Sequence, residues 1–263
     1  MLSTRYVTGS PSWFDLGTPD MDAAAAFYTG VFGWTYQPGG PEVGGYGTFQ
    51  ASGKTIAGGM AITPEQGGPT WNLYFQTPDI EATAKSVEQA GGKVVVPPMD
   101  VMELGRSAVF QDAAGVGFSG WQPQQMNGME AAGGRDTLAW VELYTPDVKA
   151  ATGFYHAVFG WESTEVPFPG GTYTTVNPAT AGPDGMFGGV VPLDNDALES
   201  EAGAYWMPYI EVADADATAA KARELGGTVR MAPMDVEGVG RLGRIADPFG
   251  ARIAIITSSM DAS

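Results

Sequence analysis

Four short stretches of the chain alternate between apolar and polar side chains, a pattern that predicts half-buried β-strands. The stretches are Trp13–Gly17, Asn72–Gln76, Trp140–Tyr144 and Met207–Glu211. Successive side chains of a strand point to opposite faces of the sheet. In the second stretch, Leu73 and Phe75 share one face, whereas Asn72, Tyr74 and Gln76 share the other. We expect the apolar face of each strand to lie under helices.

An alanine-rich stretch with helical spacing follows each predicted strand. The tripeptide Thr-Pro-Asp joins strand to helix in both halves, for example at Thr18–Asp20. Proline cannot join a central hydrogen-bond ladder, and aspartate caps the first turn of a helix, so each tripeptide marks a helix start. A glycine is placed to end each helix, as C-terminal glycines do. These glycines are Gly33, Gly91, Gly160 and Gly226.

The chain contains an internal repeat. FYTGVFGW at Phe27–Trp34 recurs as FYHAVFGW at Phe154–Trp161, 127 positions later (154 − 27). A second pair of similar segments, Trp71–Val101 and Trp206–Val236, is offset by 135 positions (206 − 71). The second half therefore carries a longer loop, around Ala179–Ala202. A weaker repeat within each half gives a unit of strand, helix and about three strands that occurs four times.

The four units are predicted to form two domains. The units begin near Ser12, Thr70, Ala139 and Ala204. We predict a first domain at residues 1–124, a second at 135–263, and a linker at 125–134, in a region rich in Gly, Asn and Gln. A unit of roughly 50 residues cannot cover its own sheet, so we expect the units to pair.

The repeated octapeptide is interpreted as part of the scaffold. Phe27, Tyr28, Val31 and Phe32 lie at helical spacing and form an apolar stripe that suits packing on the back of a sheet. Phe154, Tyr155, Val158 and Phe159 repeat this stripe in the second half. The repeated Pro-Met-Asp tripeptides, Pro98–Asp100 and Pro233–Asp235, are interpreted as a repeated turn.

Charge and composition narrow the possible partners. The 263-residue chain has 13 Lys and Arg against 30 Asp and Glu, a formal net charge of −17, which disfavours nucleic acid and anionic membranes as partners. It has no cysteine, which fits a cytoplasmic protein without disulfides or thiolate metal sites. No signal peptide and no apolar run of about 20 residues is evident. We expect a small-molecule ligand, and the sequence leaves monomer and homodimer open.

The whole pattern resembles the vicinal oxygen chelate superfamily, which includes glyoxalase I, extradiol dioxygenases, fosfomycin-resistance enzymes and bleomycin-binding proteins. The shared features are the strand–Thr-Pro-Asp–helix–FY-x-x-V-F-G-W order, a Gly-Gly turn after the second helix, and D-x-x-G before the last strand, at Asp112–Gly115 and Asp247–Gly250. The chain is most similar to tandem, two-domain actinobacterial members. The resemblance implies an α+β fold in which four βαβββ units pair into two cupped, barrel-like glyoxalase/bleomycin-resistance domains.

The resemblance also implies where a metal would be bound. In the first half the corresponding positions hold Trp13, Asn72 and Ser119, and in the second half they hold Trp140, Met207 and Ala254. Trp, Met and Ala cannot bind a hard divalent ion, and Asn or Ser alone would bind it poorly. The one histidine, His156, falls on a predicted helix and is interpreted as a surface or packing residue. We therefore expect no metal and no cofactor.

By the family's geometry, the strand faces opposite the helices line the cups. The ligand-binding residues predicted on this basis are Trp13, Asn72, Tyr74, Trp121, Trp140, Tyr144, Met207 and Tyr209, and Phe49, Met60, Tyr173 and Phe187 are further candidates. Arg106 and Arg241 follow glycines at matching positions and either reach the mouth of a cup or balance nearby acids. Asp15 and Glu142 occupy equivalent positions and are the candidate catalytic acids, each able to act as a general base or to bind a basic ligand.

Three functions remain open at this stage. The first is a metal-free protein that binds a partly aromatic molecule in its cups, for sequestration of an antibiotic or metabolite. The second is a metal-independent isomerase, lyase or hydroxylase-type enzyme that uses Asp15 or Glu142 as base. The third is a structural or partner-binding protein, in which Trp13 and Trp140 fill the cups as core.

Overall fold

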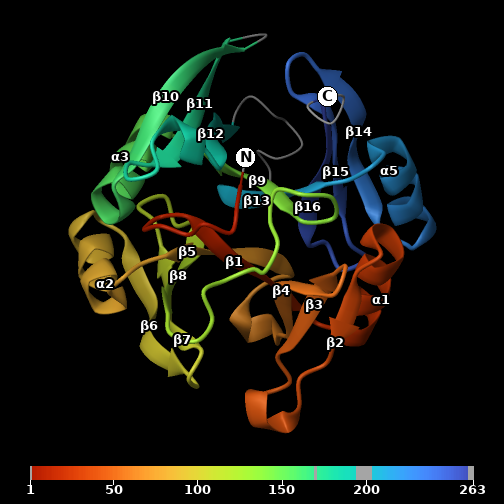
Figure 1. Cartoon of the computed structure of the whole chain (residues 1–263), viewed down its shortest axis with the longest axis horizontal. Coiled ribbons are helices and arrows are strands. Elements are labelled where there is room, and N and C mark those ends of the chain that lie inside the picture. Colours follow the sequence, from red (N-terminus) through yellow and green to blue (C-terminus); the bar gives the residue numbers. More distant parts are fainter. Residues whose placement is uncertain (1, 169–170, 194–202, 260–263) are drawn as a thin grey trace. The chain divides into compact units, whose positions relative to one another are not determined.

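The computed structural model describes residues 2–168, 171–193 and 203–259 (Figure 1). The helices are α1 (Met21–Phe32), α2 (Ile80–Gln89), α3 (Val148–Phe159) and α5 (Ala215–Glu224). The strands of the first half are β1 (Pro11–Thr18), β2 (Thr35–Gln37), β3 (Gly47–Ala51), β4 (Lys54–Ala61), β5 (Thr70–Gln76), β6 (Lys93–Val101), β7 (Gly105–Gln111) and β8 (Gly117–Pro123). Those of the second half are β9 (Leu138–Thr145), β10 (Trp161–Phe168), β11 (Gly171–Pro178), β12 (Gly188–Pro192), β13 (Tyr205–Glu211), β14 (Thr228–Val236), β15 (Gly240–Ala246) and β16 (Arg252–Ser258).

The strands form two mixed sheets of eight. The first has the order β2-β3-β4-β1-β5-β8-β7-β6, and the second has the equivalent order β10-β11-β12-β9-β13-β16-β15-β14. Within each unit the first strand runs parallel to the last, as β1 does to β4, and the neighbouring hairpins are antiparallel. The predicted α+β class and the four βαβββ units are confirmed. Both units of a half contribute to one cupped sheet, a point that the sequence left open.

The predicted helix starts are confirmed. Asp20, Asp79, Asp147 and Asp214 each occupy the N-cap of a helix, where a side-chain oxygen accepts a hydrogen bond of 2.9–3.0 Å from the backbone N–H three residues later. Each bond satisfies one of the backbone donors that a helix leaves unpaired in its first turn. The helices consequently begin at the same place in all four units.

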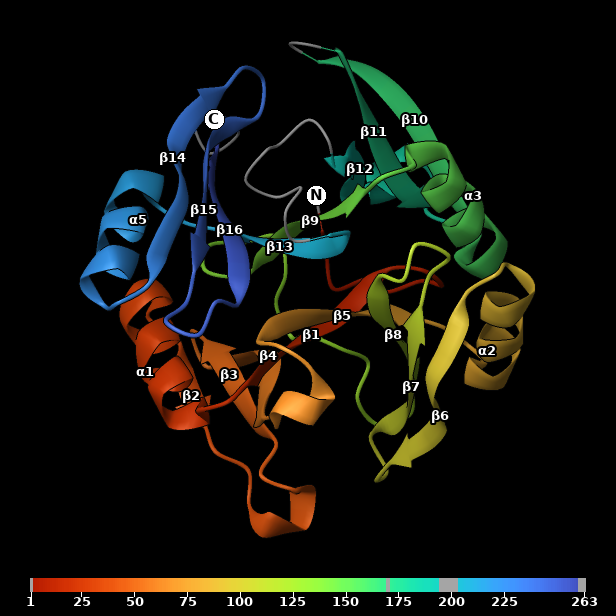
Figure 2. The ribbon, with the colours of Figure 1, turned by 180° about the vertical axis from the view of Figure 1, so that it is seen from behind.

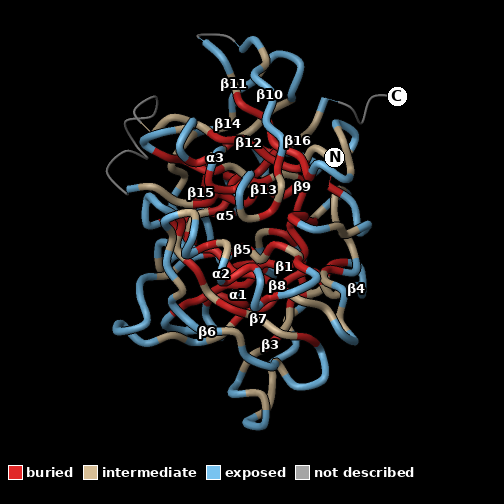
Figure 3. Tube along the Cα trace, turned by 90° about the vertical axis from the view of Figure 1, so that its left-hand side faces the viewer, coloured by how far each residue is buried: buried red, intermediate tan, exposed pale blue. Residues whose placement is uncertain are grey.

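The predicted face assignment is also confirmed. In β5, Leu73 and Phe75 are fully buried, whereas Asn72 is exposed and Tyr74 is half-buried. The central strands β1 and β13 are buried along most of their length, as the red stretches of Figure 3 show. We use the term concave face for the side of each sheet that points away from its helices.

The described chain divides into two compact units that cross the repeat. One unit comprises Met1–Trp13, Asn72–Gly128 and Trp140–Trp206, and the other comprises Phe14–Trp71, Met129–Ala139 and Met207–Ser263. Each compact unit thus combines a βαβββ segment from the first half with one from the second. In the first, helices α2 and α3 are in contact, and in the second, α1 and α5 are (Figures 1 and 2). The domain bounds 1–124 and 135–263 remain a prediction.

A buried hydrogen-bond chain joins the two halves within each compact unit. In one, the Trp71 indole N–H donates to the Tyr28 hydroxyl (2.9 Å), which donates to Asp247 (3.1 Å). Backbone N–H groups of Phe249 and Ala251 donate to the other oxygen of Asp247, each at 2.9 Å. Burial raises the pKa of Asp247, and together with that carboxylate it raises the pKa of Tyr28 well above its ordinary value.

The other compact unit contains the equivalent chain. The Trp206 indole donates to the Tyr155 hydroxyl (3.2 Å), and this hydroxyl donates to Asp112 (3.2 Å). Burial again raises the pKa of both Asp112 and Tyr155. The tyrosine of the repeated octapeptide is therefore bonded to the aspartate of the D-x-x-G motif from the other half, which explains why both motifs occur twice.

The predicted linker packs against the first half. Residues 125–134 contain no helix or strand. Within this segment Met129 is buried, and Glu130 is bonded to Thr55 of β4 through its backbone N–H (2.8 Å) and its carboxylate (2.6 Å). The backbone carbonyl of Met126 accepts a hydrogen bond from the Trp121 indole (2.9 Å). The connection is thus held at several points along its length.

The prediction of a turn at the two Pro-Met-Asp tripeptides was wrong. Pro98–Asp100 lies within β6 and Pro233–Asp235 lies within β14. These strands form one edge of each sheet, and the register of each shifts irregularly along its single neighbour. An edge strand has one unpaired side, so proline is tolerated there without loss of a ladder hydrogen bond.

The longer loop predicted around Ala179–Ala202 is described only in part. It contains a 3₁₀ turn at Pro183–Gly185 and the strand β12, and its residues 194–202 lie outside the described residues. Over the part of the chain that the structure describes, no helix is long and apolar enough to cross a membrane.

Candidate functional site

A cluster of hydrogen-bonded rings surrounds Glu142 on the concave face of β9–β12. The Tyr173 hydroxyl donates to one oxygen of Glu142 (2.6 Å), and the Tyr144 hydroxyl donates to the other (2.7 Å). The Trp140 indole N–H donates to the Tyr173 hydroxyl (2.9 Å). Tyr144 also stacks on Tyr205, with ring centroids 5.1 Å apart and planes 7° from parallel. We call these five residues the Glu142 cluster.

The Glu142 cluster combines fixed geometry with partial access. Glu142, Trp140 and Tyr173 are each half-buried, and Tyr144 is buried. Short hydrogen bonds to a carboxylate are stronger than those between neutral groups, so they hold the two phenol rings in place. Rings fixed in this way present flat apolar faces beside a negatively charged group.

The first half contains a smaller version of this arrangement. The Tyr46 hydroxyl donates to Asp15 (3.0 Å), and Asp15 is buried on β1. Tyr46 and Tyr173 are separated by the same 127 positions (173 − 46) as Asp15 and Glu142. Gly17 stands at the position equivalent to Tyr144, so the first half lacks the second phenol. The offset of the repeat could have identified Tyr46, which the sequence analysis missed, as it missed Tyr205.

A glycine beneath each tyrosine hydroxyl makes the tyrosine–carboxylate hydrogen bond possible. Gly189 of β12 is paired with Glu142 across the strands, and Gly58 of β4 is paired with Asp15. A Cβ at Gly189 would collide with the hydroxyl of Tyr173, and one at Gly58 would collide with that of Tyr46. Both glycines are therefore required by close approach of a ring.

Substitution of Gly189 by Ala is expected to displace Tyr173 from Glu142 and to lower the free energy of unfolding by about 1–3 kcal/mol, because the site has no room for a methyl group. Urea unfolding measures the loss, and the emission of Trp140 should shift because its N–H loses an acceptor. Gly117→Ala is the matched control: this β8 glycine has no atom within 4 Å of an added Cβ, and we expect a change below about 0.5 kcal/mol. Equal losses in the two variants would contradict this account.

The other residues predicted to bind ligand differ in exposure. Trp13, Trp121, Met207 and Tyr209 are buried, Tyr74 is half-buried and Asn72 is exposed. Strand register places Tyr74 in one row with Ser119 and Val109, and Tyr209 in one row with Ala254 and Arg244. Paired residues share a face, so Tyr74 and Tyr209 lie on the concave faces of their sheets.

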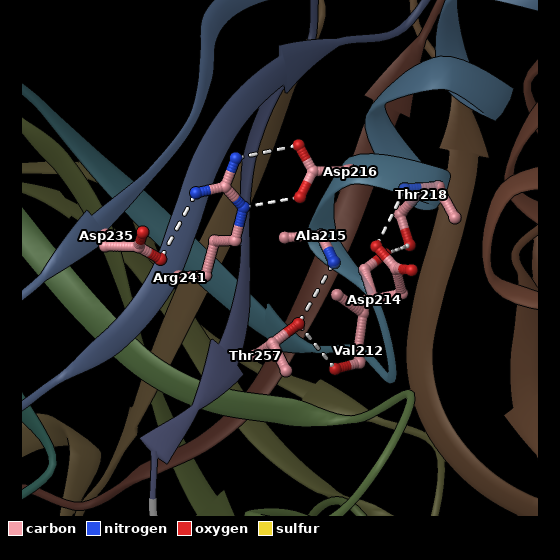
Figure 4. Close-up of polar contacts among 9 residues, drawn as sticks. Val212, Asp214, Ala215, Asp216, Thr218, Asp235, Arg241 and Thr257 are labelled. Atoms are coloured by element: carbon pink, nitrogen blue, oxygen red, sulfur yellow. Dashed lines mark hydrogen bonds and ion pairs between the residues drawn. The ribbon is translucent and has the colours of Figure 1, made fainter.

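Arg106 and Arg241 lie on the opposite, helix-covered faces. Arg241 binds both oxygens of Asp216 in the first turn of α5 and also pairs with Asp235 (3.2 Å), as Figure 4 shows. Arg106 binds Glu81 in the first turn of α2 (2.8 Å) and Asp100 (3.1 Å). Of the two roles weighed from the sequence, the balancing of nearby acids is the one that fits these contacts.

Phe49 and Phe187, which the sequence made candidates for the cups, belong to the core instead. Phe49 is paired with Ala57, next to Gly58 and on the other face, and it packs on Trp34 with centroids 5.6 Å apart. Phe187 packs on Trp161 at 5.0 Å. Both rings are buried among aromatic residues of the repeated octapeptide region, a contact that strand alternation alone does not reveal.

In the second half, the residues at the positions implied for metal ligands do not fit a divalent ion. The Trp140 ring nitrogen carries a proton that it donates to Tyr173, and Ala254 and Met207 offer no oxygen or nitrogen donor. Among the described residues, no three His, Cys, Asp or Glu side chains are grouped so that they could hold a metal. His156 is exposed and its Nδ1 is bonded to the Trp161 carbonyl (2.8 Å), as expected for a surface residue.

One surface pocket lies elsewhere, at the start of α3. It has a volume of about 240 Å³ and is lined by residues that include Asp112, Pro146, Asp147 and Phe154. Both carboxylates in its wall are already bonded to backbone N–H groups. The pocket contains none of the predicted site residues, and we place the candidate site on the concave faces.

Comparison with known proteins agrees with this architecture. Residues 10–119 and 137–255 each match the family model of the Glyoxalase/Bleomycin resistance protein/Dioxygenase superfamily. The Anthracycline biosynthesis protein DauV of Streptomyces sp. (strain C5) is 38% identical over 268 residues, covering 96% of this chain and 94% of that protein. The protein named Putative glyoxylase CFP32 of Mycobacterium bovis is 34% identical over 263 residues, covering 96% of each chain.

Solved structures share the fold at low sequence identity. The crystal structure of the Mn(II)-bound glyoxalase from Novosphingobium aromaticivorans superimposes with a TM-score of 0.60 and 16% identity, covering 97% of this chain and 83% of that one. Such a likeness supports the fold alone. Because the family model matches both halves and relatives above 30% identity span nearly the whole chain, this protein is a tandem member of the glyoxalase/bleomycin resistance protein/dioxygenase superfamily.

Proposed function

We propose that this protein binds a small, planar aromatic molecule on the concave faces of its sheets, without a metal ion, in the cytoplasm. The observation that carries the proposal is the Glu142 cluster, in which hydrogen bonds of 2.6–2.9 Å hold Trp140, Tyr144 and Tyr173. Rings that are already fixed lose little conformational entropy when a ligand stacks on them, which favours binding. Apolar walls with a few polar groups are the usual lining of a small-molecule site.

The relatives support an aromatic ligand. The relative that is 38% identical is named an anthracycline biosynthesis protein, and we propose a ligand of that aromatic class for this chain. Sequestration of an antibiotic or metabolite, as in the bleomycin-resistance part of the superfamily, needs only burial and stacking. The absence of suitable ligand atoms at Trp140, Met207 and Ala254 supports binding without a metal. Stoichiometric zinc, iron, nickel or manganese in the purified protein would contradict this part of the proposal.

A second candidate function is a metal-independent enzyme. The observation that favours it is the repeated tyrosine–acid pair, Tyr173 with Glu142 and Tyr46 with Asp15. A carboxylate with a phenol beside it can move a proton to or from a ligand, with the carboxylate as base. The two candidates differ in what the acid does, because stacking on the rings needs no proton transfer.

Binding is tested by thermal shift and fluorescence titration with a panel of anthraquinones and anthracyclines. A ligand at 100 times its Kd adds about 2.7 kcal/mol to the free energy of unfolding. Trp140→Ala is expected to weaken binding about tenfold, because it removes a stacking surface worth about 1.5 kcal/mol. Lack of response to every aromatic compound in wild-type protein would contradict the proposal.

Glu142→Gln separates binder from enzyme. A binding protein should keep its affinity within about threefold, because the rings remain and an amide oxygen still accepts a hydrogen bond. An enzyme should lose turnover by about 100-fold or more, because the base is gone. Glu165→Gln is the matched control, since Glu165 is an exposed acid on β10.

A further inference from the structure

The surface pocket at the start of α3 lies within one compact unit and is separate from the Glu142 cluster. Its volume is about 240 Å³. Most of its wall is apolar, and the apolar residues that line it include Ala113, Ala114, Pro146, Ala151 and Phe154. A pocket with apolar walls and few polar groups suits a small molecule that buries a ring.

One polar side chain in this wall is buried and has no acceptor for its proton. Thr145, the last residue of β9, lines the pocket and has 1% of its surface exposed. Its hydroxyl oxygen accepts a long hydrogen bond from the Asp147 N–H (3.5 Å). In the part of the chain that the structure describes, no group accepts a hydrogen bond from this hydroxyl. A buried donor without a partner costs free energy, so Thr145 favours a ligand that offers an acceptor.

The equivalent threonine before α2 does have a partner. Thr77 begins the same Thr-Pro-Asp tripeptide, and its hydroxyl lies 2.7 Å from the hydroxyl of Thr83, six positions later (83 − 77). The residue six positions after Thr145 is Ala151. A methyl group offers no hydrogen bond and occupies less volume than the side chain of threonine. The alanine therefore leaves both the Thr145 proton and the space beside it to a ligand.

The repeat also indicates that a phenyl group fits this place in the fold. At the offset of 135, Phe249 stands in the position of Ala114 (249 − 114). The two loops have the same local geometry, because the Phe249 N–H donates to Asp247 (2.9 Å) and the Ala114 N–H donates to Asp112 (2.8 Å). Phe249 is half-buried although it lies on a surface loop, so the protein covers part of its side chain. Ala114 leaves the volume of such a ring open.

The charges in the wall disfavour an anionic ligand. Asp112 and Asp147 both line the pocket, and each accepts a backbone hydrogen bond of 2.8–2.9 Å. A second negative charge close to these carboxylates would be repelled. The carboxylates already have donors within the protein, so a neutral ligand leaves them satisfied.

We propose that this pocket is a second binding site, which takes a small neutral aromatic molecule with one hydrogen-bond-accepting oxygen, such as an aryl ketone. The ring packs between Ala114 and Phe154, and the oxygen accepts the hydrogen bond from Thr145. Burial of the ring supplies most of the binding free energy, and the hydrogen bond orients it. This site goes beyond the proposed function, because none of its residues belongs to the Glu142 cluster.

The test uses acetophenone as the probe and protein with isotope-labelled alanine methyl groups. Titration followed by NMR is expected to shift the methyl signals of Ala113, Ala114 and Ala151, because these residues line the pocket. Benzoate has the same ring and a negative charge, and it should bind about tenfold more weakly. Thr145→Val should lower the affinity for acetophenone about fivefold relative to ethylbenzene, which has no oxygen, because one neutral hydrogen bond is lost.

Two further variants fill the pocket with side chains taken from the repeat. Ala151→Thr introduces the hydroxyl found at Thr83, and Ala114→Phe introduces the ring found at Phe249. Each should lower the affinity for acetophenone about tenfold, because the space and, in the first, the free proton are taken. Ala157→Thr is the matched control and should keep the affinity, since Ala157 is exposed on the same helix and outside the pocket.

Unchanged affinity in both filling variants would overturn the inference, because acetophenone would then bind elsewhere. A titration that shifts none of the pocket methyl signals in wild-type protein would overturn it as well. Neither result would affect the proposed function, which the anthraquinone and anthracycline panel tests separately. If one filling variant does not fold, the other filling variant and Thr145→Val decide the outcome.

Discussion

The first half of the chain, residues 1–124, is expected to form no stable monomer when it is produced alone. Its Tyr28 is fully buried by contacts that include Asp247, and its Phe75 packs on Trp161 and Trp206, with centroids 5.0 and 5.3 Å apart. These partners all belong to the second half. Removing them exposes aromatic surface, and each large side chain that returns to water costs about 1.5–3 kcal/mol.

The isolated half is expected to form a homodimer instead. The half retains both kinds of partner, because Asp112 is equivalent to Asp247 and Tyr28 is equivalent to Tyr155. Two copies can therefore reproduce the cross-half bonds, with Tyr28 of one copy donating to Asp112 of the other. Light scattering after gel filtration measures the mass. The control is Tyr28→Phe in the same half, which should weaken the dimer. A folded monomer of the unchanged half with a native-like melting temperature would contradict the prediction.

Asp247→Ala is expected to lower the free energy of unfolding of the whole chain by about 3 kcal/mol. The change removes the acceptor of the Tyr28 hydroxyl and of two backbone N–H groups, and each buried donor left without a partner costs about 1–3 kcal/mol. Burial raises the pKa of Asp247, because the charged form of the carboxylate is disfavoured away from water. Removing this carboxylate therefore offsets part of the cost. Urea unfolding monitored by circular dichroism measures the difference.

The repeat supplies a matched variant for this prediction. Asp112 has the same set of partners, namely Tyr155 and the backbone N–H groups of Ala114 and Val116, so Asp112→Ala should cost a similar amount. Asp214→Ala is the contrasting control: it removes an exposed helix cap, which costs about 1 kcal/mol. A loss below 1 kcal/mol for both Asp247→Ala and Asp112→Ala would show that the cross-half chains contribute little.

A double-variant cycle isolates the bond itself. Tyr28→Phe removes the donor of this hydrogen bond, and Asp247→Ala removes its acceptor. If the bond is formed as described, the double variant should cost about 1–2 kcal/mol less than the two single changes added together. Additive effects would mean that the two groups are not coupled.

Much of the fold followed from local patterns. Strand alternation placed Leu73 and Phe75 under helices, and aspartate after each strand marked the helix starts. These features depend on residues two to four positions apart, whose relation is set by the geometry of a strand or a helix turn. Face assignment also identified Glu142 and Trp140 as neighbours on one surface, because they are two positions apart on one strand.

The partners of these residues depended on tertiary structure. Alternation could not show that Tyr173, 31 positions from Glu142, lies over Gly189, or that Arg106 and Arg241 bind acids in the first turn of a helix. Such contacts depend on the register between strands and on where a bulge or edge occurs. A register shift of one residue would move every side chain of a strand to the other face.

The sequence by itself determined the four βαβββ units, their boundaries to within a few residues, and which strand face carries aromatic and acidic groups. Only the tertiary structure decided that Tyr28 meets Asp247 from the other half, and that Arg244 rather than Arg241 lies on the concave face. The reason is physical: periodicity records the direction of a side chain relative to its own element, whereas its neighbours are fixed by packing and strand pairing between distant segments.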